Sequence, residues 1–372
     1  MKITIIAPYP VYPVRFGGQA RIWGLAKGYA NIGHKVTVLC NTTYQFPKAK
    51  TGTIDGVHIV IIRTWIQDLV AYLATKKIIP LIASYPINSV LGFLFQGHWN
   101  DSDVVIFEQP FLAGWSRYVS NSLTVYSAQN VEEQYDLNMF DSSWHKSLFF
   151  PLLKKCEAWA VRQTDILFSC SEQDLEYFRK EYSLADERVF IVENGYDPQI
   201  KSPAADIKHR REPIDHTPIA LFIGSHSLPN IEAAQFITST IAPELPEWTF
   251  RIVGESANFC TPHTQNVQLV GEVKNIDNWT NDVSVGLLPL SSGSGSSLKL
   301  LEYLHRGIPV ICTDVGLRGF TSLRKYIRQS KKEEFVNLLR KRQFSFVPLH
   351  YLEGYKWRDV AGRSIKFLQE RM

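Results

Sequence analysis

Residues 287–302 read LLPLSSGSGSSLKLLE, and the organisation of the chain can be worked out from this stretch. An apolar run enters a loop made only of serine and glycine, and a helix pattern begins at Leu298. A further apolar run at 308–312 supplies the next strand. The order strand, loop, helix, strand is typical of a doubly wound α/β domain with a parallel sheet.

The serine–glycine loop at 291–297 predicts a binding site for an anion. Glycine accepts backbone conformations that other residues avoid, and small side chains let a ligand approach the backbone closely. The first turn of the following helix offers unpaired amide groups and the positive end of the helix dipole. A flexible linker is the alternative, because Gly/Ser runs usually are linkers, but the apolar flanks favour a ligand loop.

Two charged residues follow the loop. Lys299 adds a full positive charge in the first helical turn, and Glu302 lies three residues later on the same helical face. Because the dipole disfavours a cation at a helix start, Lys299 indicates an anionic partner. A cation for a diphosphate beside a carboxylate for sugar hydroxyls indicates a nucleotide-sugar site. The structural alternatives are an exposed lysine and a solvated helix carboxylate.

Length and composition favour a globular protein of two domains. The 372 residues exceed what one core usually holds, and 45% hydrophobic with 20% charged residues is ordinary. The net charge of +4 suits a polyanionic ligand or an acidic membrane surface, and it is too small to indicate nucleic acid. The five cysteines are scattered without disulfide or metal spacing, which predicts a reduced, cytoplasmic protein without a bound metal.

The run at 78–97 contains no charged residue and is therefore a candidate for membrane contact. Pro80, Pro86 and Asn88 interrupt it, which argues against a membrane-spanning helix. Two interpretations stay open: core plus one amphipathic helix, or a patch that dips into a bilayer with two lysines at its edge. The second predicts peripheral membrane contact through 70–97.

Apolar runs alternate with helical patterns along the chain. Met1 and Lys2 lead directly into the first strand, so no signal peptide is expected. Continuous apolar runs bounded by turn residues predict buried strands, and the second half of the chain repeats the arrangement of the first. The expected strands are 3–7, 34–40, 58–62, 104–107, 123–126, 166–169 and 189–192, then 219–223, 250–253, 267–270 and 308–312.

A polar, proline-bearing segment at 201–218 follows a turn cluster at 194–198 and separates the two domains. We expect Rossmann-like domains at 1–197 and 198–354, with a C-terminal helix at 355–372 that packs back on the first domain. Doubly wound sheets bind ligands at the carboxyl ends of their strands. The expected site is therefore a central cleft that both domains face.

Short motifs distributed over nearly the whole chain carry a family resemblance. Each motif alone is weak, and their order and spacing make the set specific. They read GGQAR at 17–21, GHKVTV at 33–38, AQNVE at 128–132, SCSEQD at 169–174, NGYD at 194–197, FIGS at 222–225 with PN at 229–230, IVGE at 252–255, LKLLE at 298–302 and GIPV at 307–310. Together they resemble the retaining glycosyltransferases of family four, also called glycosyl transferases group one, with the GT-B fold.

The resemblance implies a nucleotide-sugar donor site in the second domain and an acceptor side in the first. Glu302 would bind the donor ribose, loop amides would cradle the diphosphate, and Gln129 and Lys299 would act in catalysis. The donor-binding residues implied are Gly17, Gly18, Gly224, Ser225, Gly295, Ser296, Ser297, Leu298, Lys299 and Glu302. From the residues alone, turn chemistry for the glycine pair and a structural polar role for Gln129 and Glu108 remain open.

The sequence departs from the family pattern at three positions. Ser294 stands where the family often has a second acid, eight residues before Glu302. Gln129 stands where histidine is common, and an amide hydrogen-bonds a hydroxyl but takes up no proton near neutral pH. Ser225, followed by His226, stands where the family has an arginine, which moves more of the phosphate contact to Lys299.

The expected function is that of a metal-independent, retaining hexosyltransferase without a cofactor. Its partners would be a nucleotide-diphosphate-sugar donor and a glycan or lipid-linked acceptor, with no nucleic acid. By family analogy, it would act in cell-envelope or polysaccharide biosynthesis, in the cytoplasm or at the inner face of the membrane. The alternatives are a nucleotide-sugar-binding protein without transferase activity and a nucleotide-sugar epimerase on the same fold.

Overall fold

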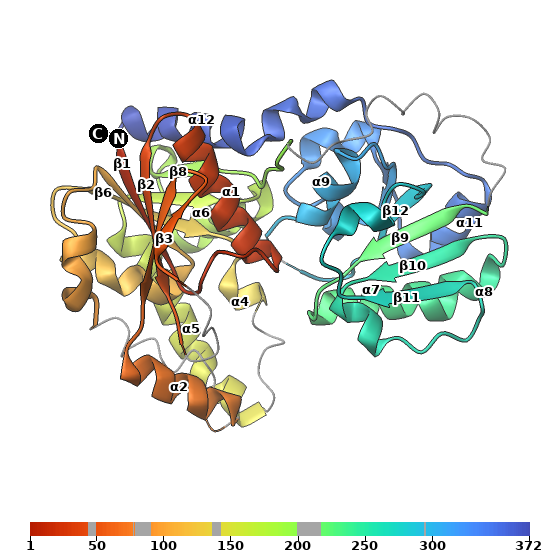
Figure 1. Ribbon diagram of the computed structural model, residues 1–372, viewed down its shortest axis with the longest axis horizontal. Helices are drawn as coiled ribbons and strands as arrows, with labels where there is room; N and C mark the ends of the chain where they lie inside the picture. Colours follow the sequence, from red (N-terminus) through yellow and green to blue (C-terminus); the bar gives the residue numbers. More distant parts are fainter. Residues whose placement is uncertain (44–49, 77, 79–90, 136–142, 199–216, 294) are drawn as a thin grey trace. The chain divides into compact units, whose positions relative to one another are not determined.

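The computed structural model describes residues 1–43, 50–76, 78, 91–135, 143–198, 217–293 and 295–372 (Figure 1). The chain forms two compact units. The first consists of Met1–Gly195 together with Trp357–Met372, and the second consists of Tyr196–Lys356. The expected linker at 201–218 lies outside the described residues except for its last two positions.

The first unit contains an eight-stranded sheet in the order β3-β4-β2-β1-β5-β6-β7-β8. All neighbouring strands are parallel except β3 and β4, which form an antiparallel hairpin. The strands are β1 (Lys2–Ala7), β2 (Lys35–Asn41), β3 (Gly52–Ile54), β4 (Val57–Ile62), β5 (Val104–Glu108), β6 (Leu123–Ala128), β7 (Ile166–Ser169) and β8 (Val189–Ile191). A parallel sheet with both faces covered explains why these strands are continuous apolar runs.

Helices cover both faces of this sheet. They are α1 (Gly17–Asn31), α2 (Trp65–Thr75), η2 (Gly92–His98), η3 (Pro110–Tyr118), α4 (Glu132–Tyr135), α5 (Ser143–Gln163), α6 (Glu172–Tyr182), η5 (Asp186–Arg188) and α12 (Trp357–Gln369). Successive residues of β1 point to opposite faces, so Ile5 joins the core under α1 and α12 while Ile6 joins the core that includes η3 and α6.

The last helix, α12, packs along α1 (Figure 1). The two helices approach so closely that a Cβ on Gly28 would lie 2.5 Å from the Trp357 carbonyl oxygen. Tyr29 and Ser364 join across the contact through a 3.0 Å hydrogen bond between their buried hydroxyls. The chain therefore completes the core of its first unit with its last residues.

The second unit contains a six-stranded, fully parallel sheet in the order β11-β10-β9-β12-β13-β14. Its strands are β9 (Ile219–Ile223), β10 (Thr249–Val253), β11 (Val267–Gly271), β12 (Val285–Leu288), β13 (Val310–Cys312) and β14 (Arg328–Gln329). Its helices are α7 (Leu228–Phe236), η8 (Ile237–Ile241), α8 (Ala242–Glu244), η9 (Glu255–Phe259), η10 (Ile276–Trp279), α9 (Leu298–Leu304), α10 (Asp314–Leu317), η11 (Thr321–Tyr326), η12 (Lys332–Glu334), α11 (Phe335–Arg340) and η13 (Leu349–Tyr355). One continuous buried core joins the sheet to these helices.

The structure adds short strands that the apolar runs do not reveal. β3 pairs with β4 across a two-residue turn in which Asp55 and Gly56 have φ values of 50° and 79°. Asp-Gly is a preferred pair for such a hairpin turn. Three exposed or half-buried residues form β3, so hydrophobicity gives no signal for it.

Candidate active site

The serine–glycine loop leaves β12 at the carboxyl edge of the second sheet and enters α9 at Leu298. Gly295 is buried and has a φ of 73°, a left-handed conformation that favours glycine. Ser294, one of the three departures from the family pattern, lies outside the described residues. The predicted strand–loop–helix arrangement is thus present, with α9 only seven residues long.

The loop packs against the segment that follows β13. A Cβ on Gly319 would lie 2.1 Å from the Cβ of Ser296, so the two backbones are in close contact. The Ser297 amide, one of the predicted diphosphate donors, donates to the Arg318 carbonyl oxygen at a long 3.4 Å. The Ser297 hydroxyl is buried and has no hydrogen-bond partner within the described part of the chain. A ligand oxygen would satisfy that hydroxyl.

Lys299 and Ser225 are brought together by Asn230, which belongs to α7. Lys299 Nζ donates to Asn230 Oδ1 at 2.7 Å, and Asn230 Nδ2 donates to Ser225 Oγ at 2.9 Å. Asn230 is buried, and burial lowers the pKa of Lys299 to about 8. The structural alternative of a fully exposed lysine is therefore wrong, because this ammonium is held in a polar network and partly removed from water.

Gly224 precedes Ser225 at the end of β9 and has a packing role of its own. A Cβ at this position would lie 2.2 Å from Ser256 Oγ, and the Gly224 amide donates to the Val253 carbonyl at 2.8 Å. The glycine thus permits the loops after β9 and β10 to touch. Donor binding by Gly224 stays a prediction.

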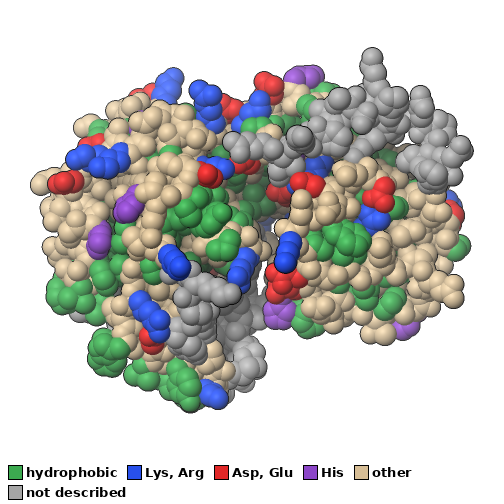
Figure 2. Space-filling view, viewed as in Figure 1, with side chains coloured by type: hydrophobic (Ala, Val, Ile, Leu, Met, Phe, Trp, Pro, Cys, Tyr) green, Lys and Arg blue, Asp and Glu red, His purple; other side chains and the backbone are tan. Residues whose placement is uncertain are grey.

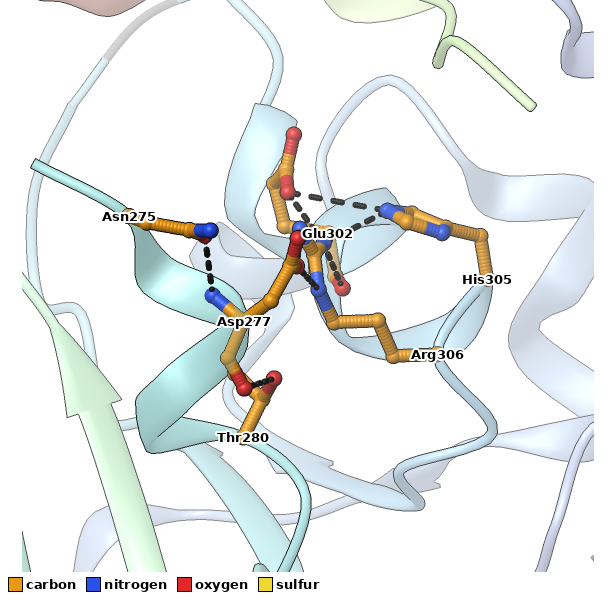
Figure 3. Close-up of polar contacts among 6 residues, drawn as sticks. All are labelled: Asn275, Asp277, Thr280, Glu302, His305 and Arg306. Atoms are coloured by element: carbon orange, nitrogen blue, oxygen red, sulfur yellow. Dashed lines mark hydrogen bonds and ion pairs between the residues drawn. The ribbon is translucent and has the colours of Figure 1, made fainter. Parts of the chain in front are cut away.

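Glu302 is anchored by its own helix turn and by a buried arginine (Figure 3). Arg306 Nη1 contacts Glu302 Oε2 and also donates to the Glu302 carbonyl at 2.8 Å. Asp277 holds the other side of Arg306, accepting from Nε at 3.1 Å and from Nη2 at 2.9 Å. Figure 3 shows one Glu302 oxygen facing Arg306 and His305, and the other pointing away from them.

The surroundings of Glu302 keep it charged. Burial raises the pKa of Glu302, but its contacts with His305 and the charge of Arg306 lower the pKa more, so the net shift is downward. The imidazole of His305 stacks on Tyr196 with ring centroids 5.1 Å apart. Tyr196 donates its amide to the Tyr355 carbonyl at 2.9 Å. Tyr196, the first residue of the second unit, therefore packs against the residue that follows the helix carrying Glu302.

The remaining predicted residues lie in the first unit. A Cβ on Gly18, the second residue of the glycine pair that begins α1, would lie 2.9 Å from Gln129 Oε1, so the pair passes directly beside the amide. Gln129 is buried immediately after β6 and donates from Nε2 to Glu108 Oε2 at 2.9 Å. Because the side-chain nitrogen of Gln129 faces Glu108, its Oε1 faces Gly18 and Gln109, whose Nε2 lies 3.5 Å away.

Arg21 completes this buried cluster and was not singled out by sequence reasoning. Its Nη1 donates to Asn194 Oδ1 at 2.9 Å, and its Nε and Nη2 have no hydrogen-bond partner among the residues that the structure describes. Burial raises the pKa of Glu108, and the Arg21 charge, followed by hydrogen bonds from Gln129 and Ser127, opposes that shift. Arg21 of α1 thus lies near an acid and an amide at the strand ends of the first sheet.

Sequence reasoning also missed the positioning roles of Asn230 and Arg306. Asn230 stood inside the motif after β9, and Arg306 stands four residues after Glu302, the spacing of an ion pair along a helix. Both residues stand at recognisable local positions, but their partners are distant in the sequence. Lys299 lies 69 residues from Asn230, and Asp277 lies 29 residues from Arg306.

The two doubly wound units, each built on a mostly parallel sheet, have the GT-B fold. Two sequence families match the chain: the one described as "Glycosyltransferase Family 4" over residues 16–200, and the one described as "Glycosyl transferases group 1" over residues 217–338. The protein belongs to the family-four, group 1 glycosyltransferases, which confirms the resemblance seen in the motifs.

Solved structures of low sequence identity share the fold over the whole chain. A sucrose-phosphate synthase from Thermosynechococcus elongatus has a TM-score of 0.68 at 13% identity and covers 100% of this chain and 94% of its own. The lipopolysaccharide outer core galactosyltransferase WaaB has a TM-score of 0.61 at 13% identity and covers 100% of both chains. HepE from Anabaena, solved with UDP and glucose, has a TM-score of 0.61 at 12% identity, covering 100% of this chain and 98% of its own.

No curated protein matches the sequence significantly. Within the described ranges, no helix combines the length and the apolar character needed to cross a bilayer.

Proposed function

We propose that the protein is a retaining hexosyltransferase that takes its sugar from a nucleotide-diphosphate donor. The observation that carries this proposal is the pair of anchored charges on α9, Lys299 held by Asn230 and Glu302 held by Arg306, in a family-four glycosyltransferase. Similar structures include one solved with UDP and glucose, which supports the same donor class for this chain.

The proposed donor chemistry assigns one role to each anchored charge. Negative charge builds on the diphosphate as the glycosidic bond breaks, and Lys299 would stabilise it together with the amides of the loop. Glu302 would accept hydrogen bonds from the ribose hydroxyls through the oxygen that points away from Arg306. We propose that these groups act without a metal ion or a cofactor.

In the first unit, we assign the sugar-facing role to Gln129. Its oxygen, turned away from Glu108, can accept a hydrogen bond from a hydroxyl. Retention of anomeric configuration, by attack of the acceptor on the leaving-group face, is taken from the family. Because Gly18 lies beside Gln129, we propose that the loop at Gly17 and Gly18 also takes part in donor binding.

The proposed acceptor is a glycan or a lipid-linked glycan of the cell envelope or of a polysaccharide. A neighbour named as a lipopolysaccharide galactosyltransferase and the net charge of +4 support this choice. The proposed location is the cytoplasm, at the inner membrane face, with contact through 70–97. Within that segment, 77 and 79–90 lie outside the described residues.

A two-stage screen tests the proposal. A thermal-shift panel of nucleotides and nucleotide sugars should single out one nucleoside diphosphate, because a ligand of the native state raises stability. The selected donor is then incubated with mixed glycan and glycolipid acceptors. Transfer supports the proposal, binding without turnover indicates a nucleotide-sugar-binding protein, and isomerisation of the sugar without an acceptor indicates an epimerase.

A further inference from the structure

Helix α2 has a capped start and one buried face. Its start is defined by a capping box. The backbone N–H of Gln67 donates to Thr64 Oγ1 at 3.3 Å, and the backbone N–H of Thr64 donates to Gln67 Oε1 at 2.9 Å. Val70 and Ala71 on the inner face are only 5% and 2% exposed. The helix is therefore well formed at its start and has an inner, buried face opposite an outer one.

The outer face of α2 is apolar as well. Trp65 is 74% exposed, and Leu69 and Tyr72 are each 49% exposed. Their spacing of four and three residues puts them on one stripe of the helix. Ile78, just beyond the helix end, is 54% exposed. In Figure 2, hydrophobic side chains gather over α2, at the lower left of the view.

A stripe of this kind indicates an interaction surface, because aromatic and leucine side chains gain free energy when they leave water. We name Trp65, Leu69 and Tyr72 the outer α2 stripe. Tryptophan and tyrosine combine an apolar ring with a polar group, and both are enriched where a membrane meets water.

A positive charge lies at the C-terminal end of the outer α2 stripe. Lys76 follows the last turn, is exposed, and holds its ammonium 5.8 Å from the centre of the Tyr72 ring. Arg63 precedes the helix and pairs with Asp68 at 2.8 Å, so Lys76 supplies the net charge. A cation beside aromatic rings on one face of a short helix is the composition of helices that lie in the plane of an anionic bilayer.

We propose that the outer α2 stripe seats the enzyme on an anionic lipid bilayer, with α2 parallel to the surface and Lys76 among the headgroups. The eleven residues of α2 are too few to span the hydrocarbon, which fits an in-plane position. The inference deepens the proposed function, whose acceptor includes lipid-linked glycans. Binding to vesicles needs neither donor nor acceptor, so the two can fail separately.

The test is co-sedimentation of the full chain with vesicles of phosphatidylcholine alone and of phosphatidylcholine mixed equally with phosphatidylglycerol. We expect binding to the mixed vesicles that weakens as salt rises. Trp65→Ser combined with Leu69→Ser should weaken it roughly 10- to 100-fold. Lys76→Gln should weaken it about fivefold on mixed vesicles only.

Leu269→Ser is the matched control, because Leu269 is 37% exposed on β11 in the second unit. It should bind vesicles like the unchanged protein, and thermal melting of every variant verifies folding. Equal binding to both vesicle types, no binding to either, or equal losses for Leu269→Ser and the double variant would overturn the proposal. A monomer–dimer equilibrium abolished by the double variant would instead assign the stripe to a second copy of this chain.

Discussion

One carboxylate oxygen of Glu302 contacts Arg306, and the other points away from Arg306 and can accept from a ligand. We predict that Glu302→Ala weakens binding of the selected nucleotide roughly 10- to 150-fold, because charge-assisted hydrogen bonds of about 1.5–3 kcal/mol are lost. Isothermal titration calorimetry measures the change. Glu333→Ala, which removes an exposed carboxylate of η12, is the control. Unchanged affinity for Glu302→Ala would remove Glu302 from the donor site.

Lys299 makes the affinity of the proposed donor site for a nucleoside diphosphate depend on pH. Its pKa of about 8 in the folded protein lies below the ordinary 10.5, so the ammonium loses its proton above about pH 8. Affinity for a nucleoside diphosphate should therefore fall as pH rises above about 8. Lys299→Met should bind weakly at every pH and lack this fall, while a nucleoside without phosphates should bind both proteins alike. Equal losses for nucleoside and diphosphate would show that Lys299 does not contact phosphate.

The same pKa shift affects stability with the opposite sign. Because the unfolded chain binds a proton at Lys299 between about pH 8 and 10.5 and the folded chain does not, stability relative to Lys299→Met should rise over that window. This follows from burial of the ammonium near Asn230, which disfavours its charged form.

At the scale of elements, the contact between α1 and α12 predicts opposite effects for two glycines. Gly28→Ala places a Cβ 2.5 Å from the Trp357 carbonyl, so the helices must separate and stability should fall by about 1–3 kcal/mol. Gly362→Ala, on α12 with open space around its Cβ, should raise stability by about 0.4–1 kcal/mol. Denaturant unfolding measures both, and a stable Gly28→Ala protein would mean that the two helices pack less closely than described.

At the scale of the whole molecule, each unit has its own core, and α12 belongs to the core of the first. A chain ending at Lys356 loses the buried Val360, Ala361 and Leu368, which belong to that core. We predict faster hydrogen exchange in β1 and β2 and unchanged exchange in β9 and β10. Equal loss of protection in both sheets would show that the units do not hold separate cores.

Much of the fold could be predicted from the sequence because parallel strands that are buried on both faces consist of continuous apolar residues. The expected runs at 104–107 and 219–223 correspond to β5 and β9, and the glycine–serine stretch lies between β12 and α9 as expected. The short strands β3 and β14 were not predicted, because neither contains a buried residue that would give an apolar signal.

The α/β class, the order of the strands along the chain and the family can be predicted from the residues alone, since periodicity and motif spacing are local properties of the chain. The partners that hold the site residues become visible only in the folded chain. Asn230 meets Lys299, Asp277 meets Arg306, and Glu108 orients Gln129, because the parallel topology brings the carboxyl ends of distant strands to one edge. Those pairings depend on strand order across the sheet, which no local pattern in the chain specifies.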